Sequence, residues 1–358
     1  MTFADFMALA LYEPRVGYYA RAVQRSGRAG DFVTSVDLGP AFGALLARQF
    51  AEMWRHLGSP GALDLIEAGA GNGRLSRDVL DAARRDPAFY DAVRLHLVER
   101  SPLARAAQAD RLGPHASRLA SAGEDLPAVG CGVLFANELL DAMPVHVVVM
   151  RADGLREIYV DLEGDALVER EGSPSTPRLW QYLEQAGAQL EPGWRAEINL
   201  DAVDWVRRAA RSLRQGFLLL IDYGHEAGDL FSAAHATGTL TSYRRQVSPD
   251  DHRRPWLVEP GTCDMTSHVD LTSACRVAVS EGLTVLALLD QMYFLLGIGL
   301  ADQFAVRPGD AVADLNRRLA LKALMLPGGL GSTHKVLILG KDVGAPRLMA
   351  TACGARLT

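Results

Sequence analysis

Residues 62–73, ALDLIEAGAGNG, constrain the fold of this chain more than any other stretch. A short apolar run ends in Glu67. Three alternating glycines follow, Gly69, Gly71 and Gly73, and the next residues, RLSRDVLDAARR, space their apolar side chains as an amphipathic helix does. The stretch therefore predicts a strand, a tight glycine turn and a helix.

The alternation of strand and helix recurs along the chain. Residues 93–99, VRLHLVE, predict a buried strand that ends in Glu99, and the helix behind it begins with a Ser cap and a Pro. Further buried strands are predicted at 132–138, 217–224, 284–289 and 334–339. This pattern predicts an α/β fold with a mostly parallel sheet covered by helices on both faces.

Two stretches depart from this alternation. Residues 145–172 contain hairpin signals, Asp-Gly and Gly-Asp, and predict an inserted antiparallel sheet. Residues 225–266 are rich in Gly, Pro, His, Arg and Ser, with little periodicity. We expect them to form a long loop over the carboxyl edge of the main sheet, where long ordered loops are usually functional.

Composition excludes several classes of protein. The 358 residues are 49% hydrophobic and 22% charged, which is typical of a globular protein with a sizeable core. A formal net charge of -6 argues against nucleic acid as the main partner. Four cysteines without CxxC spacing indicate reduced thiols, so no metal is expected. Without a leader-like N-terminus or an apolar run of about 20 residues, we expect a cytoplasmic protein with no membrane span.

The glycine turn predicts a ligand site. Glycines where a strand meets a helix let a ligand approach the backbone and the free N–H groups, although the turn also needs glycine for packing alone. Glu99 lies at the place where doubly wound folds present a carboxylate to a ribose, so it is expected to accept two hydroxyl hydrogen bonds.

The spacing of the turn bears on which nucleotide binds. A dinucleotide fingerprint reads G-x-G-x-x-G, whereas this turn reads G-x-G-x-G with Glu67 two residues ahead. A carboxylate there repels a diphosphate and suits an ammonium or sulfonium. The pattern resembles motif I of the class I S-adenosylmethionine methyltransferases, and the identity of the cofactor rests on that resemblance.

Several longer motifs resemble one family, the MidA-like methyltransferases, whose mitochondrial members are complex I assembly factors. Beside the glycine turn, the resemblance covers about residues 3–341 and rests on these motifs: FADFMALALYEPRVGYY (3–19), GDFVTS (30–35), LVERSP (97–102), ANELLDAMPVH (136–146), IDYG (221–224) and DMTSHVD (264–270). It implies a class I methyltransferase, Rossmann-like α/β fold with a seven-stranded sheet, an N-terminal lid, and inserted antiparallel strands and loops over the active site.

The resemblance also divides the chain. We expect an N-terminal helical lid and a cofactor-binding core that two insertions interrupt. The segments are 1–58 (lid), 59–144 (first part of the core), 145–200 (inserted sheet and helix), 201–224 (core continued), 225–270 (inserted loop over the active site), 271–342 (last part of the core) and 343–358 (tail).

The resemblance implies further cofactor contacts from the lid. GDFVTS is expected to fold over the cofactor pocket, with Asp31, Thr34 and Ser35 facing the ligand. Thr34 and Ser35 are equally suited to cap the following helix. The family commonly reads SPE where this chain reads Ser35-Val36-Asp37, so the contact of that acid stays open.

Other cofactor contacts are expected at the sheet edge. Glu124 and Asp125 fall where related enzymes hold the adenine amino group, or form a surface turn. The predicted cofactor-binding residues are Asp31, Thr34, Ser35, Glu67, Gly69, Gly71, Gly73, Glu99, Glu124, Asp125 and Asn137.

Three acids are predicted on the substrate side. Glu138 and Asp141 follow a predicted strand at the carboxyl edge of the sheet, and Asp222 ends another. The resemblance implies an arginine substrate, whose guanidinium the carboxylates of Glu138 and Asp141 would hold in a bidentate fork, with Asp222 as a further candidate. Helix capping and surface acidity are the alternative interpretations.

Histidines are weaker candidates. His146, His225 and His268 are potential proton acceptors, although a lone histidine is more often structural.

The leading hypothesis is an S-adenosylmethionine-dependent methyltransferase acting on an arginine of a partner protein. Gln246 and the sequence Ser-Val-Asp depart from the family's usual residues and favour a small-molecule O- or N-methyltransferase of specialised metabolism as the alternative. A non-catalytic assembly or binding factor is a further alternative. Glu67 argues against a nicotinamide dehydrogenase. The sequence leaves the oligomeric state open, a homodimer included.

Overall fold

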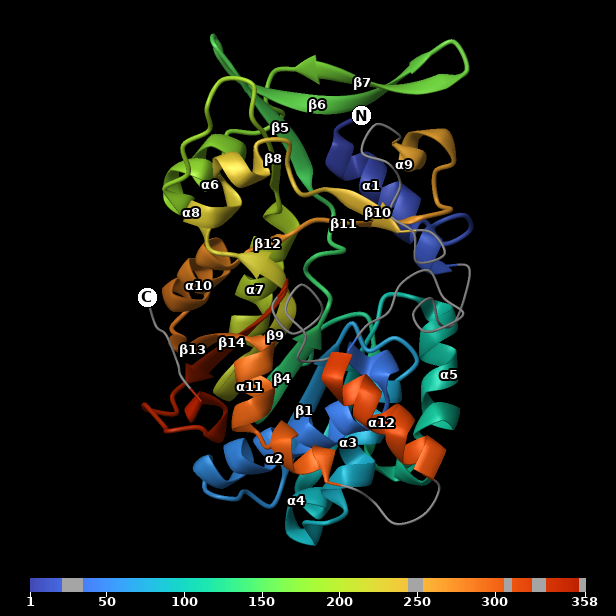
Figure 1. Ribbon diagram of the computed structural model, residues 1–358, viewed down its shortest axis with the longest axis vertical. Helices are drawn as coiled ribbons and strands as arrows, with labels where there is room; N and C mark the ends of the chain where they lie inside the picture. The colour runs from blue at the N-terminus through green and yellow to red at the C-terminus, as the bar shows by residue number, and fades with distance from the viewer. Residues whose placement is uncertain (21–34, 244–253, 306–310, 324–332, 354–358) are drawn as a thin grey trace.

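A sheet of mostly parallel strands forms the centre of the lower half of the molecule in Figure 1. The computed structural model describes residues 1–20, 35–243, 254–305, 311–323 and 333–353. The strand order is β3-β2-β1-β4-β9-β14-β13, and β14 runs antiparallel to both of its neighbours. The strands are β1 (Leu63–Ala68), β2 (Val93–Val98), β3 (Leu119–Gly123), β4 (Val129–Asn137), β9 (Leu213–His225), β13 (Thr284–Asp290) and β14 (His334–Lys341).

The predicted α/β class is confirmed, and a two-residue strand β12 (Val269–Asp270) extends the sheet by pairing with the end of β9. The edge strand β3 was not predicted. Its residues, LASAG, are small and mostly exposed, so they lack the apolar run that marks the inner strands.

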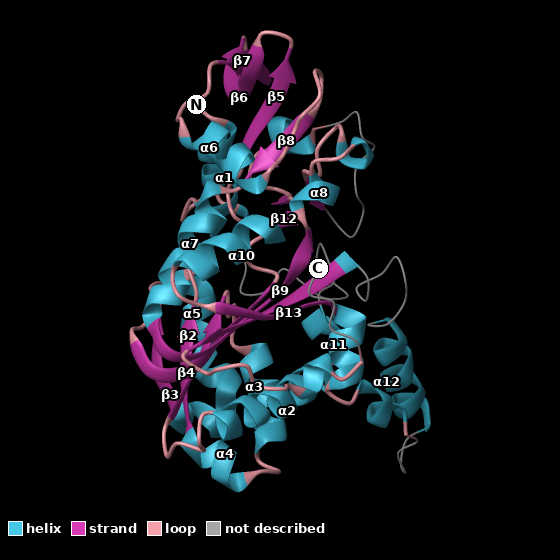
Figure 2. Ribbon diagram, turned by 90° about the vertical axis from the view of Figure 1, so that its left-hand side faces the viewer, coloured by secondary structure: helices cyan, strands magenta, loops and turns pink. Residues whose placement is uncertain are grey.

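Helices cover both faces of the sheet, as Figure 2 shows. One face packs against α2 (Ala41–His56), α3 (Arg74–Ala83) and α11 (Gln291–Gly297). The other face packs against α7 (Leu200–Ser212) and α10 (Leu271–Ser280). Strand residues alternate between the two cores, because successive side chains of a strand point to opposite faces.

Helix α2 falls within the segment that was expected to form the lid. The ring of Phe50 of α2 packs on that of Phe135 of β4, with centroids 4.8 Å apart and planes tilted by 41°, and both side chains are fully buried. This helix is therefore a layer of the core. The remaining helices of the lower half are α4 (Pro87–Ala92), α5 (Pro102–Leu112) and α12 (Ala311–Ala323), with short 3-10 helices η2 (Ser35–Leu38), η3 (Gly113–Arg118), η5 (Leu300–Phe304) and η6 (Met349–Thr351).

A second, antiparallel sheet lies above the core in Figure 1. Its order is β7-β6-β5-β8, and the predicted turns at Gly154 and Gly164 join its first three strands with positive φ angles. The strands are β5 (His146–Arg151), β6 (Gly154–Glu163), β7 (Ala166–Gly172) and β8 (Arg195–Ile198), with α6 (Arg178–Ala186) between the last two. Helix α1 (Phe3–Tyr12) packs on β5 and β6, and the Met1 ammonium donates to the Val160 carbonyl at 3.0 Å.

The segment after β9 is more regular than a loop. It contains α8 (Ala227–Leu230), the 3-10 helix η4 (Ala233–His235), β10 (Thr241–Tyr243), α9 (Pro255–Val258) and β11 (Asp264–Thr266). Strands β10 and β11 pair with each other beside α1. We call this segment, together with α1, η1 (Tyr18–Ala20) and the second sheet, the cover. Among the described residues, no helix is long and apolar enough to cross a bilayer.

Candidate functional site

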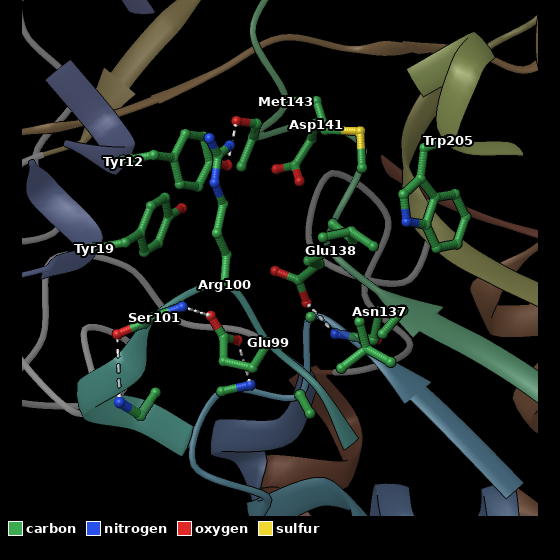
Figure 3. A pocket seen from close by; sticks show the side chains of 18 of the residues that line it. Tyr12, Tyr19, Glu99, Arg100, Ser101, Asn137, Glu138, Asp141, Met143 and Trp205 are labelled. Carbon is green, nitrogen blue, oxygen red and sulfur yellow. Dashed lines mark hydrogen bonds between the residues drawn. The ribbon is translucent and has the colours of Figure 1, made fainter. Parts of the chain in front are cut away.

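A cavity of about 830 Å³ opens where the carboxyl ends of β1, β2 and β4 meet the cover. This volume is in the range of small-molecule sites. The core contributes the glycine turn and the ends of the three strands, and the cover contributes Tyr12, Tyr19, Asp264 and His268. Figure 3 shows the side chains that converge on it.

The three glycines of the predicted turn have left-handed φ angles of +70° at Gly69, +49° at Gly71 and +83° at Gly73. A Cβ at Gly71 would meet no atom within 4 Å, so the backbone there is open. A Cβ at Gly69 or Gly73 would instead lie 3.1–3.2 Å from a leucine methyl group. Both interpretations of the turn therefore hold, packing at its two ends and ligand approach at its centre.

Glu99 bridges the turn and the end of β2. Its Oε2 accepts from the Gly71 N–H at 2.7 Å, and its Oε1 accepts from the Ser101 N–H at 2.7 Å (Figure 3). Each carboxylate oxygen has a second lone pair. The carboxylate is thus held rigidly at the cavity wall, with acceptor capacity left for two neighbouring hydroxyl groups.

Glu67 lies near the end of β1 and bonds to the start of α3. Its carboxylate accepts from the backbone N–H of Ser76 at 3.1 Å and also from the Ser76 hydroxyl, at the first turn of α3. Burial raises the pKa of Glu67 to about 8 and so favours its neutral form. A neighbouring cation favours the ionised form, so the predicted negative charge beside the cofactor stays a prediction. Glu67 lines the cavity as a hydrogen-bonded group that anchors α3.

Two predicted acids lie at the cavity rim. Glu124 and Asp125 both line the cavity. The Glu124 side chain is 56% exposed and pairs with Arg105 at 2.7 Å.

The lid residues have a mixed outcome. Asp31 and Thr34 lie outside the described residues. Ser35 is buried and its hydroxyl contacts Gln291 Oε1 at 3.3 Å. It does not cap α2, because that helix begins at Ala41 behind an N-cap proline without a side-chain bond. Ser35 does not line the cavity, and its N–H donates to Glu138 Oε1, so its cofactor contact stays a prediction.

Glu138 follows β4 in a left-handed conformation, with φ of +52°. This conformation is unfavourable for a residue with a Cβ, and such strain is concentrated at functional sites. Its N–H donates to the Ile221 carbonyl at 2.8 Å. Its Oε1 accepts from the Asn137 amide at 3.1 Å and the Ser35 N–H at 3.2 Å (Figure 3). Glu138 and Asn137 both line the cavity, as predicted.

Asp141 also lines the cavity, and its carboxylate is buried. Its Oδ1 has no hydrogen-bond partner among the described residues. Burial, and secondly the negative charge of Glu138, raise the pKa of Asp141 to about 7. Figure 3 shows the carboxylates of Glu138 and Asp141 on one side of the cavity, between Arg100 and Trp205.

The prediction that Asp222 is catalytic is corrected by its contacts. Its Oδ2 accepts from the backbone N–H groups of Leu139 at 3.1 Å and Leu140 at 2.8 Å, and its Oδ1 accepts from that of Tyr223. The side chain is buried behind the cavity wall and does not line the cavity. Asp222 is therefore a positioning residue that holds the turn after β4.

Several cavity residues were not singled out from the sequence. The rings of Tyr12 and Tyr19 stack at 5.4 Å, and the Arg100 guanidinium lies 4.6 Å from the Tyr12 ring (Figure 3). The Tyr19 hydroxyl donates to Asp264 Oδ1 at 2.9 Å. Both tyrosines belong to the motif FADFMALALYEPRVGYY, a family signature to which the sequence assigns no role. Trp205 of α7 completes the opposite wall.

The histidines separate into two groups. His146 Nδ1 lies 2.7 Å from Glu157 Oε1 and the residue does not line the cavity. His268 does line it, and forms a cluster with His225 and with His235, which no sequence spacing singled out. Burial and the two neighbouring imidazoles lower the pKa of His268 to about 4.

Comparison with known proteins agrees with this geometry. Residues 45–289 match the model of a family described as S-adenosyl-L-methionine-dependent methyltransferases. A solved structure of a protein from Burkholderia thailandensis, bound to S-adenosyl-homocysteine, is 31% identical and has a TM-score of 0.89. The match covers 100% of this chain and 92% of that protein.

Curated relatives are also similar over most of the chain. The Drosophila melanogaster protein arginine methyltransferase NDUFAF7 homolog is 29% identical over 78% of this chain and 67% of its own length. The human protein arginine methyltransferase NDUFAF7 is 28% identical over 84% of this chain and 70% of its own length. Both names carry the word mitochondrial.

The cavity fits S-adenosylmethionine. The open backbone at Gly71 and the carboxylate of Glu99 provide the cradle that a nucleoside requires, and Glu124 and Asp125 lie at the same rim. The matched residues include this cradle as well as Glu138 and Asp141. Apart from the short strand β12, the main sheet has the seven strands that the resemblance to class I methyltransferases implies. The chain belongs to the MidA-like family of S-adenosylmethionine-dependent methyltransferases.

Proposed function

We propose that this methyltransferase acts on an arginine side chain of a partner protein, and that Glu138 and Asp141 hold its guanidinium. The names of the relatives, protein arginine methyltransferases, support the substrate class. The chemistry of the acceptor side of the cavity supports the residues.

The observation that carries the proposal is the pair of carboxylates on one turn. Glu138 and Asp141 line the same cavity as the cofactor cradle, and both side chains are almost fully buried. Two buried carboxylates on one turn favour a cation beside them, because the hydrogen bonds to Glu138 and its contact with His334 Nε2 at 3.5 Å offset only part of their repulsion and desolvation. The raised pKa of Asp141 reflects this situation, since an entering guanidinium would stabilise its ionised form.

A guanidinium matches this pair in shape and charge. Its planar fork of N–H donors binds carboxylates in a bidentate manner, which fixes the orientation of the nitrogen to be methylated. S-adenosylmethionine supplies an activated methyl group when bound. The chain itself aligns the acceptor nitrogen and excludes water, and Asp141, ionised beside the guanidinium, would accept the proton that the nitrogen loses on methylation.

The test is methyl transfer by Glu138→Gln. The substitution keeps the size of the side chain and removes its charge, so transfer should fall by at least about a hundredfold, or roughly 2.7 kcal/mol. Affinity for S-adenosylmethionine should be unchanged. Glu191→Gln, which alters an exposed carboxylate outside the cavity lining, is the matched control.

The readout is methyl label in a cell lysate, followed by amino-acid analysis of the labelled proteins. Methylarginine in wild-type reactions that is lost with Glu138→Gln supports the proposal. Label confined to small molecules would instead assign the enzyme to the small-molecule methyltransferases, and cofactor binding without transfer would indicate an assembly or binding factor.

A further inference from the structure

Three histidine side chains from separate segments meet beside the acceptor end of the cavity. His225 ends β9, His235 ends η4, and His268 lies between β11 and β12. One ring nitrogen from each histidine can be chosen so that all three lie within 4.8 Å of one another. The ring centroid of His225 lies 4.9 Å from that of His235 and 5.0 Å from that of His268. We call these three residues the histidine cluster.

The hydrogen bonds leave ring nitrogens available in this cluster. The Nδ1 of His235 lies 2.9 Å from the Asp229 carbonyl oxygen, which can only accept, so Nδ1 carries the proton and the lone pair is on Nε2. This arrangement is common among metal-bound histidines, because a carbonyl acceptor fixes the tautomer and orients the ring. The Nδ1 of His268 is buried and has no hydrogen-bond partner among the described residues.

Ring contacts between neutral imidazoles, which are tilted or edge-on to one another, are a poor explanation for the cluster. A buried ring nitrogen without a hydrogen-bond partner is unfavourable unless something binds it. Of the charged groups near His225, Lys335 lowers its pKa and Asp229 raises it. In the described part of the chain, no carboxylate hydrogen-bonds to a ring of the cluster. A cation that accepts nitrogen lone pairs would satisfy these rings.

We propose that the histidine cluster binds one divalent transition-metal ion, with Zn²⁺ as the best match. Imidazole nitrogen suits Zn²⁺ among the common biological metals, and three histidines with a water molecule form a familiar tetrahedral set. With bonds of about 2.0–2.1 Å, tetrahedral geometry separates the nitrogens by roughly 3.3 Å. The cluster, at up to 4.8 Å, must therefore contract by small rotations of its side chains when the ion binds.

The position of the cluster indicates what the ion would do. In Figure 1, α8 and β12 lie at the upper end of β9, so the ion would join a core strand to two segments of the cover. His268 is part of the cavity wall, and its backbone N–H donates to the Thr239 hydroxyl oxygen at 3.0 Å. The ion would thus fix the wall on the acceptor side, away from the glycine turn that binds the cofactor.

The test uses the untagged full chain, stripped with a chelator and titrated with Zn²⁺ alone in competition with a chromophoric chelator. We expect one equivalent to bind, with affinity at least about a hundredfold weaker in His235→Ala and His268→Ala. His56→Ala, which removes an exposed histidine at the end of α2, should bind as the wild type does. The proposal would be overturned if His235→Ala bound Zn²⁺ as tightly as the unmodified chain does. It would also be overturned if the unmodified chain bound less than one equivalent of Zn²⁺.

A measurement on the wild type guards against variants that fail to fold. X-ray absorption of the Zn²⁺-loaded protein should show imidazole and oxygen scattering, with no sulfur. Scattering from sulfur would assign the ion to cysteine thiolates and overturn the proposal. Titration of His235→Ala with S-adenosylmethionine reports folding independently, because His235 does not line the cavity.

Discussion

Replacing Glu99 by alanine tests how far the cofactor cradle depends on one carboxylate. In the structure its two oxygens lie 2.7 Å from the Gly71 and Ser101 nitrogens. The substitution leaves both N–H groups without this acceptor and removes the oxygens available to the two ribose hydroxyls. A hydrogen bond to a charged group contributes about 1.5–3 kcal/mol, and water replaces part of this at a partly exposed position.

We therefore expect the affinity for S-adenosylmethionine to fall by about 1.5–3 kcal/mol, or roughly 10- to 150-fold in Kd. Isothermal titration calorimetry with S-adenosylmethionine and S-adenosyl-homocysteine measures this loss directly. Glu191→Ala is the matched control, because Glu191 is exposed and lies outside the cavity lining. A loss below tenfold for Glu99→Ala, or an equal loss for Glu191→Ala, would refute the assignment of the ribose contact to Glu99.

Three further predictions concern the turn and the buried acids. Gly71→Val should abolish binding of S-adenosylmethionine, because its side chain enters open cavity space. Gly187→Val, at a left-handed glycine outside the cavity, should leave binding intact, which calorimetry checks. Because burial raises the pKa of Glu67 to about 8, the folded chain keeps a proton that the unfolded chain releases. The free energy of unfolding should therefore fall as pH rises from about 4.5 to about 8. Denaturation of Glu67→Gln, measured across the same pH range, should lack this fall. Because the pKa of Asp141 is raised to about 7, kcat/KM for methyl transfer should rise with pH through about 7, and Asp141→Asn should be slower and lose that rise.

The core could be predicted because its strands have an unmistakable pattern. β1, β4 and β9 are buried on both faces, so their sequences are continuous apolar runs between turns and helices. β8 and β10 were missed for the opposite reason. Each has three or four residues and is paired with a strand distant in sequence, so nothing local distinguishes it from a loop.

The site could be predicted only where it is local. Gly71 and Glu99 belong to two consecutive strand-turn-helix units, and their positions follow from the fold. Asp222 shows the limit of this reasoning. A strand-end carboxylate has the same sequence signature whether it faces a ligand or accepts from backbone N–H groups, and only the path of the following turn decides between these. Likewise, His235 acquires its neighbours solely through tertiary folding.

The turn after β4 is held from both sides, and this explains how the core and the cover together define the acceptor site. Asp222 of the core binds N–H groups of the turn, while the cover and α7 bind its carbonyl oxygens. The carbonyls of residues 140–142 accept in succession from the Asn199 amide at 2.9 Å, the Ser267 N–H at 3.0 Å and the Tyr12 hydroxyl at 2.7 Å. Because these donors come from three distant segments, the carboxylates of the turn adopt their positions only when the cover is in place. The cofactor cradle has no such requirement, since its own two units complete it. The proposed acceptor carboxylates are therefore tied to both the core and the cover, whereas Gly71 and Glu99 of the cofactor cradle belong to the core alone.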